Sequence, residues 1–150
     1  MSHPTRLPFA LLVILTGLSC LTGSARGAES PDDLLVIVNN AASINATTLE
    51  ELQSVFLKRK SNWADGARAA PMNASEGTVL REAFRARVLQ LTGADEAKHW
   101  SDERIRSGND APGETSVSLK AVFSSKNIVS YVFRSELKPG LVKVIATYPK

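Results

Sequence analysis

A continuous aliphatic run near the start of the chain, Leu34-Leu35-Val36-Ile37-Val38, constrains the fold more than any other feature. A strand with one solvated face alternates apolar and polar residues, whereas this run has no polar member. The run therefore predicts a strand over 34–38 that is buried on both faces, in a sheet with helices on either side. Helical patterns follow it, so we expect an α/β domain.

The rest of the chain predicts four helices and three more strands. Thr47, with Glu50 at the third position of a capping box, predicts a helix that ends near 58–60. Thr92 and Asp95 cap a later helix that Gly108 ends. The other expected elements are a weak strand over 68–72, a helix that starts at Ser75 or Thr78, a short helix over 116–123, and strands over 127–133 and 141–145. The order β-α-β-α-α-α-β-β indicates a small mixed sheet with helices packed on it.

Helical spacing also predicts which side chains are buried. The apolar stripe of the second helix consists of Leu80, Phe84, Val88 and Leu91. The arginines that this stripe directs away from the core are Arg81, Arg85 and Arg87. The inward residues expected on the third helix are Ala97, Trp100 and Ile105. Its acidic pairs, which are interpreted as solvated charges, are Asp95-Glu96 and Asp102-Glu103.

The first 27 residues have the pattern of a secretory signal peptide. Arg6 precedes an apolar run over 7–21, and small residues follow as far as Gly27. Cleavage near Gly27 would leave residues 28–150 as a single domain in the periplasm or outside the cell. Two alternatives stay open, namely an uncleaved N-terminal anchor and a lipid anchor at Cys20.

Cleavage would nearly neutralise the protein. The whole chain has 18 Lys and Arg against 15 Asp and Glu, a net charge of +3. Residues 1–27 contain Arg6 and Arg26 and no acid, so 16 basic residues would remain against 15 acidic ones. This small excess argues against a nucleic acid partner. The local cluster Lys58-Arg59-Lys60 is interpreted as the solvated end of a helix.

Catalytic and metal-binding groups are scarce in the expected domain. His99 is its one histidine, and its sequence has no cysteine. No motif pairs a nucleophile with a base, and no spacing of ligands fits zinc or calcium. Walker-type loops and dinucleotide fingerprints are absent from the sequence as well. We therefore predict that the protein is not an enzyme and uses no metal or cofactor.

The segment from Asn73 to Thr78 is the best candidate for a binding site. A loop of small residues that leads into a helix exposes backbone N–H groups, and the helix dipole adds a partial positive charge there. The candidate ligand-binding residues are Ser75, Glu76, Gly77 and Thr78. The alternative is that Ser75 or Thr78 merely caps the helix.

Several motifs resemble a known family. Residues 48–58 and Asn62-Trp63-Ala64-Asp65-Gly66 resemble the pattern L-x-x-I-F-x-G-K…N-W-x-D-G of the phosphate-binding, substrate-binding proteins of ABC transporters. A Gly-Thr helix start follows in the same order, and Asn127 to Val132 is similar to the family's G-x-I-G-Y-V strand. The resemblance implies one lobe of a type 2 periplasmic-binding-protein fold. It also implies a small, phosphate-like anion as ligand and a membrane transporter or sensor protein as partner.

The chain departs from that family at the anion loop. The family pattern R-x-D-x-S-G-T places Met72 at the arginine, Ala74 at the aspartate and Glu76 at the serine, so only Gly77 and Thr78 match. The arginine would supply paired charged donors, and Glu76 would set a like charge beside the ligand. We therefore expect weak binding of phosphate or another small anion. The alternative is a ligand-free interaction module of the cell envelope that kept the fold and lost the anion site.

Overall fold

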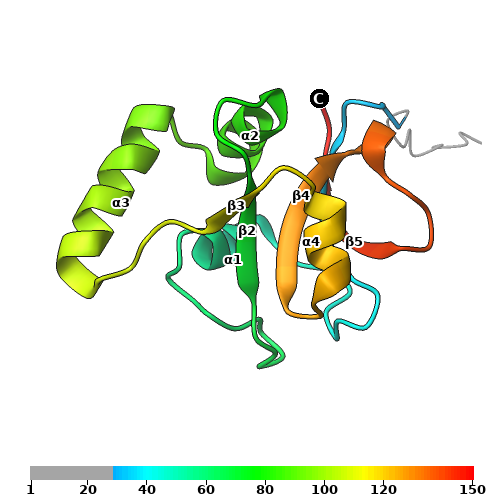
Figure 1. Cartoon of the computed structure of the whole chain (residues 1–150), viewed down its shortest axis with the longest axis horizontal. Helices are drawn as coiled ribbons and strands as arrows, with labels where there is room; N and C mark the ends of the chain where they lie inside the picture. The colour runs from blue at the N-terminus through cyan, green and yellow to red at the C-terminus, as the bar shows by residue number, and fades with distance from the viewer. Residues whose placement is uncertain (1–28) are drawn as a thin grey trace, which may run out of the picture.

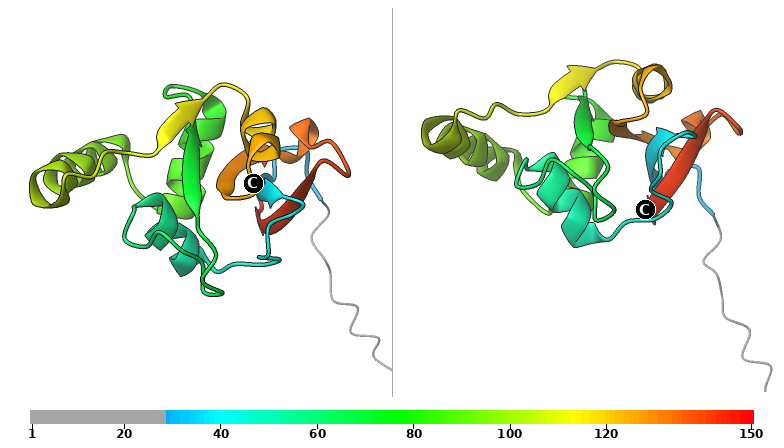
Figure 2. Two further views of the ribbon diagram at one scale, coloured as in Figure 1. Left: turned by 60° about the horizontal axis from the view of Figure 1, so that its bottom comes forward. Right: turned by 90° about the horizontal axis from the view of Figure 1, so that it is seen from below.

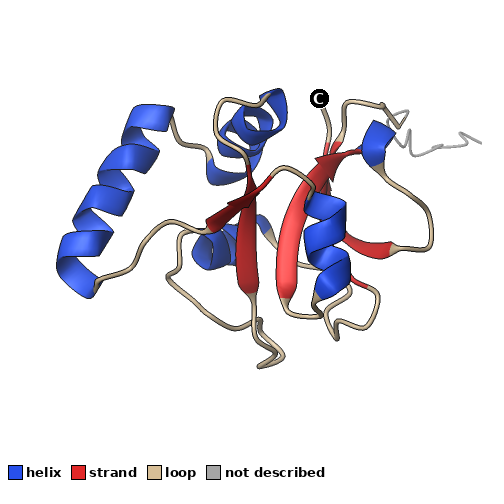
Figure 3. Cartoon of the chain, in the orientation of Figure 1, coloured by secondary structure: helices blue, strands red, loops and turns tan. Residues whose placement is uncertain are grey.

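The structure is a computed structural model that describes residues 29–150; the expected signal peptide over 1–27 and Cys20 lie outside them. One five-stranded mixed sheet, in the order β3-β2-β4-β1-β5, has helices on both faces (Figures 1 and 3). The strands are β1 Leu34–Asn39, β2 Ala70–Ala74, β3 Gly113–Thr115, β4 Ile128–Phe133 and β5 Val142–Tyr148. The helices are α1 Leu49–Phe56, α2 Val79–Phe84, the π-helix η1 Arg85–Leu89, α3 Gly93–Ser107, α4 Ser118–Ser124 and the short η2 Arg134–Glu136.

The sheet combines parallel and antiparallel pairs. β2 runs parallel to β3 and β4, while β1 runs antiparallel to β4 and β5. The predicted α/β class, with a small mixed sheet and helices packed on it, is therefore confirmed. Strand β3 was missed, because a three-residue strand with exposed Gly113 and Glu114 has no apolar alternation to reveal it.

Strand β1 is buried on both faces, as its sequence predicts. Its residues Leu34 and Val36 pack with α1 and α2, whereas Leu35 and Ile37 pack with Val122 of α4. An aromatic group lies at the centre of the first of these clusters. The ring of Phe84 in α2 stacks on Tyr131 of β4, with centroids 3.8 Å apart and an interplanar angle of 5°.

Hydroxyl side chains cap the helices much as expected. Thr92 and Asp95 form the predicted capping box of α3, and Gly108 ends that helix in the left-handed conformation, with φ at 71°. The cap of α1 is Thr48 rather than Thr47, since the Thr48 hydroxyl accepts from the N–H of Glu51 at 3.2 Å. The hydroxyl of Thr47 instead donates to the side-chain carboxylate of Glu51 at 2.8 Å.

The predicted burial is wrong for several residues of α2, η1 and α3. Arg81 and Arg85 were expected to point away from the core, yet they are 3% and 6% exposed. On α3, Glu96 and Glu103 are buried in place of Ala97 and Ile105. Helix α3 extends away from the sheet (Figure 2), so most of its surface meets water and only one edge contacts the rest of the domain.

Candidate functional site

The candidate segment forms the turn between β2 and α2. Thr78 caps α2, since its hydroxyl accepts from the N–H of Arg81 at 3.2 Å and donates to the carbonyl of Ser75 at 2.8 Å. Gly77 has a φ of 77°, a left-handed conformation that favours glycine. The capping alternative is therefore correct for Thr78, while the hydroxyl of Ser75 is left for another role.

A pocket of about 260 Å³ lies beside this turn, between the starts of α2 and α4. Five hydroxyl-bearing residues line it, namely Ser75, Thr78, Thr115, Ser116 and Ser118. The first-turn N–H groups of a helix have no partner within that helix, and both α2 and α4 begin at the pocket. The site therefore offers a group of neutral hydrogen-bond donors, from which the hydroxyl of Thr78 is excluded because it already donates to the carbonyl of Ser75.

Ser118 is notable among these residues. It is 6% exposed, and its hydroxyl takes part in none of the hydrogen bonds among residues 29–150. The hydroxyl oxygen itself is not enclosed, because the buried side-chain atoms without a partner in this range are Nε and Nη1 of Arg81, so the hydroxyl is available to a ligand or to water in the pocket. Sequence reasoning missed this half of the site, because Ser118 is about 40 residues from the turn and is brought to it by the packing of α4 on the sheet.

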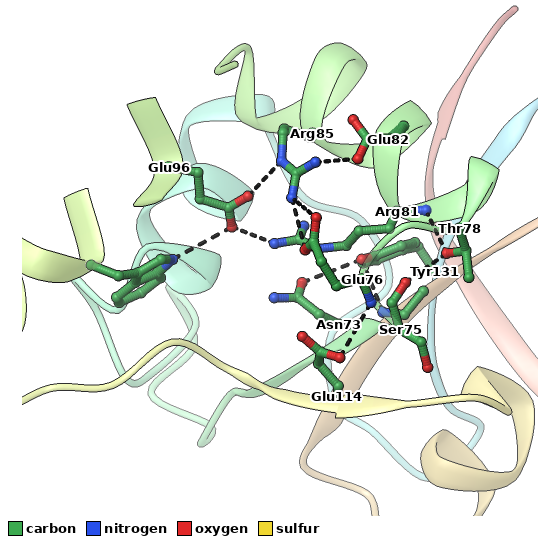
Figure 4. A network of polar contacts seen from close by, with 12 residues as sticks. Asn73, Ser75, Glu76, Thr78, Arg81, Glu82, Arg85, Glu96, Glu114 and Tyr131 are labelled. Carbon is green, nitrogen blue, oxygen red and sulfur yellow. Dashed lines mark hydrogen bonds and ion pairs between the residues drawn. The ribbon is translucent and has the colours of Figure 1, made fainter. Parts of the chain in front are cut away.

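Glu76 lies on the other side of the turn from the pocket (Figure 4). Both of its carboxylate oxygens accept from Nη2 of Arg85, at 2.7 and 2.8 Å. Its backbone N–H donates to the carboxylate of Glu114 at 3.2 Å. The structure therefore places Ser75 and Thr78 at the pocket, while Glu76 belongs to an ion cluster and faces no ligand there.

The charged side chains of the pocket differ from those of the family pattern. Its lining includes no lysine or arginine, and its one ionisable residue is Glu136. The carboxylate of Glu136 accepts from the N–H of Phe133 at 3.2 Å. Ala74, at the position of the family's aspartate, forms part of the wall. Met72, at the position of its arginine, is instead paired with Gly113 of β3. An anion in this pocket would contact dipoles rather than full positive charges, and the carboxylate of Glu136 would repel it.

An ion cluster joins α2 and η1 to α3, and we define it as Arg81, Arg85, Glu76, Glu82 and Glu96 (Figure 4). The two arginines and Glu96 are buried, whereas the side chains of Glu76 and Glu82 are more than half exposed. Glu96 is 4% exposed and lies between the two arginines. Burial opposes the ionisation of Glu96, but its hydrogen bonds to Arg85 and Arg81 and their charges outweigh this and lower the pKa of its carboxyl. The cluster thus fixes the helix that follows the candidate turn.

Tyr131 of β4 binds the end of β2 by hydrogen bonds just before the turn. Its hydroxyl accepts from the N–H of Ala74 at 3.0 Å and donates to the side-chain carbonyl of Asn73 at 3.3 Å. Burial raises the pKa of Tyr131 to about 12, so the hydroxyl stays protonated at neutral pH and keeps both bonds. The residue therefore positions the turn and supplies no acid or base.

The histidine expected to be structural is half-buried on α3. Nε2 of His99 lies 3.4 Å from the carbonyl of Leu57, and the ring packs edge-on against Trp100. Within residues 29–150, no group of three or more His, Cys, Asp or Glu side chains is placed to hold a metal. No helix in the same range is long and apolar enough to cross a membrane.

The ion cluster makes stability depend on pH in a defined direction. Because the pKa of Glu96 lies below its ordinary value of 4.5, its contribution is complete above that value and is lost as the pH falls through the folded-state pKa. We expect the stability difference between wild type and Glu96→Gln to be largest at neutral pH and to shrink below about pH 4.5. Urea unfolding at a series of pH values measures it, and a difference independent of pH would contradict the assignment.

No family model matches the sequence, and no curated protein matches it. Solved structures do match the fold. An ABC-type phosphate transport receptor from Vibrio cholerae aligns with a TM-score of 0.58 and 16% identity, over 77% of this chain and 47% of the receptor. PstS from Borrelia burgdorferi aligns with a TM-score of 0.56 and 15% identity, over 79% of this chain and 49% of PstS.

The chain spans less than half the length of either of these proteins. The name of the first describes a receptor for phosphate transport. At such low identity the likeness concerns the fold alone, and it extends over most of the described residues. The fold of the chain therefore matches about half of a phosphate ABC transporter substrate-binding protein, as the resemblance to one lobe of that family implied.

Proposed function

We propose that residues 28–150 form a substrate-binding-protein-like domain of the cell envelope that binds phosphate or another small oxyanion weakly. The ligand would lie in the pocket between the starts of α2 and α4. The observation that carries the proposal is the convergence of five hydroxyl-bearing residues and two helix starts on that pocket. Secretion by a cleaved signal peptide and delivery of the anion to a membrane transporter or sensor complete the proposed function.

Weak binding follows from the type of donors in the pocket. Hydrogen bonds to a charged partner contribute roughly 1.5–3 kcal/mol each, but association costs several kcal/mol before any net affinity appears. Without an arginine or lysine in the lining, a few such bonds give a dissociation constant of about 1 mM, or about −4 kcal/mol. Phosphate or sulfate at millimolar concentration is the appropriate probe.

Replacing Ser75 and Ser118 by alanine should weaken phosphate binding by about tenfold or more, because each loses one hydroxyl donor to the anion. Isothermal calorimetry on the mature chain measures the effect. Ser101→Ala is the matched control, because Ser101 is exposed on α3 and far from the pocket lining. Equal affinities for the double variant and the control would contradict this location of the site.

A ligand-free interaction module is the second candidate, and two exposed valines favour it. Val79 begins α2 and is 77% exposed, and Val117 precedes α4 and is 52% exposed. Val117 lines the pocket, and Val79 lies in sequence between the lining residues Thr78 and Leu80, so apolar groups that a protein partner would cover stand near the pocket. Capture of a specific partner from an envelope fraction in the absence of anion, lost in Val79→Ser with Val117→Ser, would favour this candidate.

A further inference from the structure

Four cationic side chains line a second, larger pocket at the opposite end of β2. The pocket has a volume of about 500 Å³ and lies where α1 ends and β2 begins. Its cationic residues are Lys58, Arg59, Lys60 and Arg68. The first three were interpreted from the sequence as a solvated helix end. Arg59 and Lys60 are indeed exposed, but together with Arg68 they surround a recess.

Backbone hydrogen bonds hold this segment in place. The N–H groups of Arg59 and Lys60 both donate to the carbonyl of Ser54, at 2.8 and 3.1 Å, which folds the segment back on α1. Across the pocket, the N–H of Ala69 donates to the carbonyl of Ser61 at 2.9 Å, so Arg68 is brought to the same recess. The cations are therefore gathered by fixed backbone.

Lys58, just beyond the end of α1, has an unusual backbone conformation. Its φ is 53°, in the left-handed region where glycine is favoured and a lysine is uncommon. Its ammonium group donates to the carbonyl of Ala111 at 3.5 Å, two residues after Asn109, which lines the recess. A lysine thus stands at a position where the backbone alone would favour glycine.

The four cations have no anionic partner among residues 29–150. None of them forms an ion pair with a carboxylate there, and no acidic residue lines the pocket. Elsewhere, Lys98 and Arg104 of α3 each pair with an aspartate. A recess lined by charges of one sign concentrates field lines and attracts an anion of several charges.

We propose that this recess binds a small anion that carries two or more phosphate or carboxylate groups. Its volume lies within the range of about 300–1,000 Å³ that is usual for small-molecule sites. The guanidinium groups of Arg59 and Arg68 suit pairs of oxyanion oxygens, and the two lysines add point charges. No aromatic residue lines the recess, so it offers no stacking surface to a nucleobase.

This site is separate from the pocket of the proposed function. Ala70, the first residue of β2, lines the recess, whereas Ala74, the last residue of the strand, lines the pocket between α2 and α4. The recess and the pocket therefore lie at opposite ends of β2. Either site can therefore be disabled without altering residues of the other.

Calorimetry of the mature chain with inorganic tripolyphosphate tests the proposal. We expect Arg59→Gln with Lys60→Gln to weaken binding at least tenfold, and Lys58→Gly, which suits the left-handed backbone, to weaken it without lowering the melting temperature. Binding by wild type should fall steeply between about 20 and 200 mM NaCl, because the contacts are electrostatic. Lys98→Gln with Arg104→Gln removes two positive charges from α3 and should leave the affinity for tripolyphosphate unchanged.

Three outcomes would overturn the proposal. The first is no tripolyphosphate binding at millimolar concentration, and the second is equal loss in the α3 control. The third is binding to vesicles that contain anionic phosphatidylglycerol, lost in Arg59→Gln with Lys60→Gln, without binding of tripolyphosphate; that result would assign the recess to a membrane surface. Unchanged tripolyphosphate binding in Ser75→Ala with Ser118→Ala would support a separate site.

Discussion

Replacement of Glu96 by glutamine is expected to lower the free energy of unfolding by about 3–5 kcal/mol. Glu96 is the carboxylate between Arg81 and Arg85, and all three side chains are less than one-tenth exposed. An amide keeps the shape but removes the charge, so two guanidinium groups stay buried with less compensation. Nε and Nη1 of Arg81 already have no hydrogen-bond partner within residues 29–150, which leaves little room for rearrangement.

The matched control for Glu96→Gln is Asp102→Asn on the same helix. Asp102 pairs with Lys98 at 2.6 Å, but both side chains are more than half exposed. Exposed pairs contribute about 0–1 kcal/mol, so the control should be nearly neutral in urea unfolding at pH 7. Equal effects of the two substitutions would show that burial of the ion cluster contributes nothing to stability.

Replacement of Phe84 by alanine is expected to lower the free energy of unfolding by about 3–5 kcal/mol. Phe84 is completely buried and stacks on Tyr131, while its centroid lies 4.5 Å from that of Phe56. Truncation leaves a cavity among rings that the sheet and α1 hold in place. Since Tyr131 also holds the end of β2, the variant should lose phosphate affinity along with stability.

Phe123→Ala is the control for the loss of stability expected in Phe84→Ala. Phe123 lies on α4 and is 63% exposed, so the same truncation should change the free energy of unfolding by less than about 0.5 kcal/mol. Guanidinium unfolding followed by tryptophan fluorescence compares the two variants. A loss of less than about 1 kcal/mol for Phe84→Ala would show that the aromatic group is not the centre of the core.

The parts of the fold that the sequence predicted have local signals. The aliphatic run of β1 reports burial on both faces, and the capping box at Thr92 with Gly108 marks both ends of α3. Strand β3, which the sequence did not predict, has no such local signal. Its pairing with β2 depends on residues about 40 positions away. The burial of Ile105 was predicted wrongly because α3 has little of the domain to pack against, which its own periodicity does not reveal.

The sequence predicted the part of the candidate site that comes from the start of α2. Ser75 and Thr78 follow from the small residues before an amphipathic helix, and both line the pocket. The residues that α4 contributes were not predicted, because no local sequence pattern places Ser118 opposite that turn. Glu76 was interpreted as a charge opposed to an anion, yet Arg85 binds its carboxylate away from the pocket. That pairing spans nine residues and depends on the π-helical turn that follows α2.

The most direct test of the proposed anion site is a phosphate titration of the isotopically labelled mature chain, followed by its amide NMR spectrum. The proposal predicts saturable shifts at millimolar phosphate for amides of residues 75–80 and 116–119, at the starts of α2 and α4. Amides of residues 93–107 in α3 should stay unchanged. Absence of saturable shifts in both helix starts, or shifts confined to Lys58-Arg59-Lys60, would contradict it.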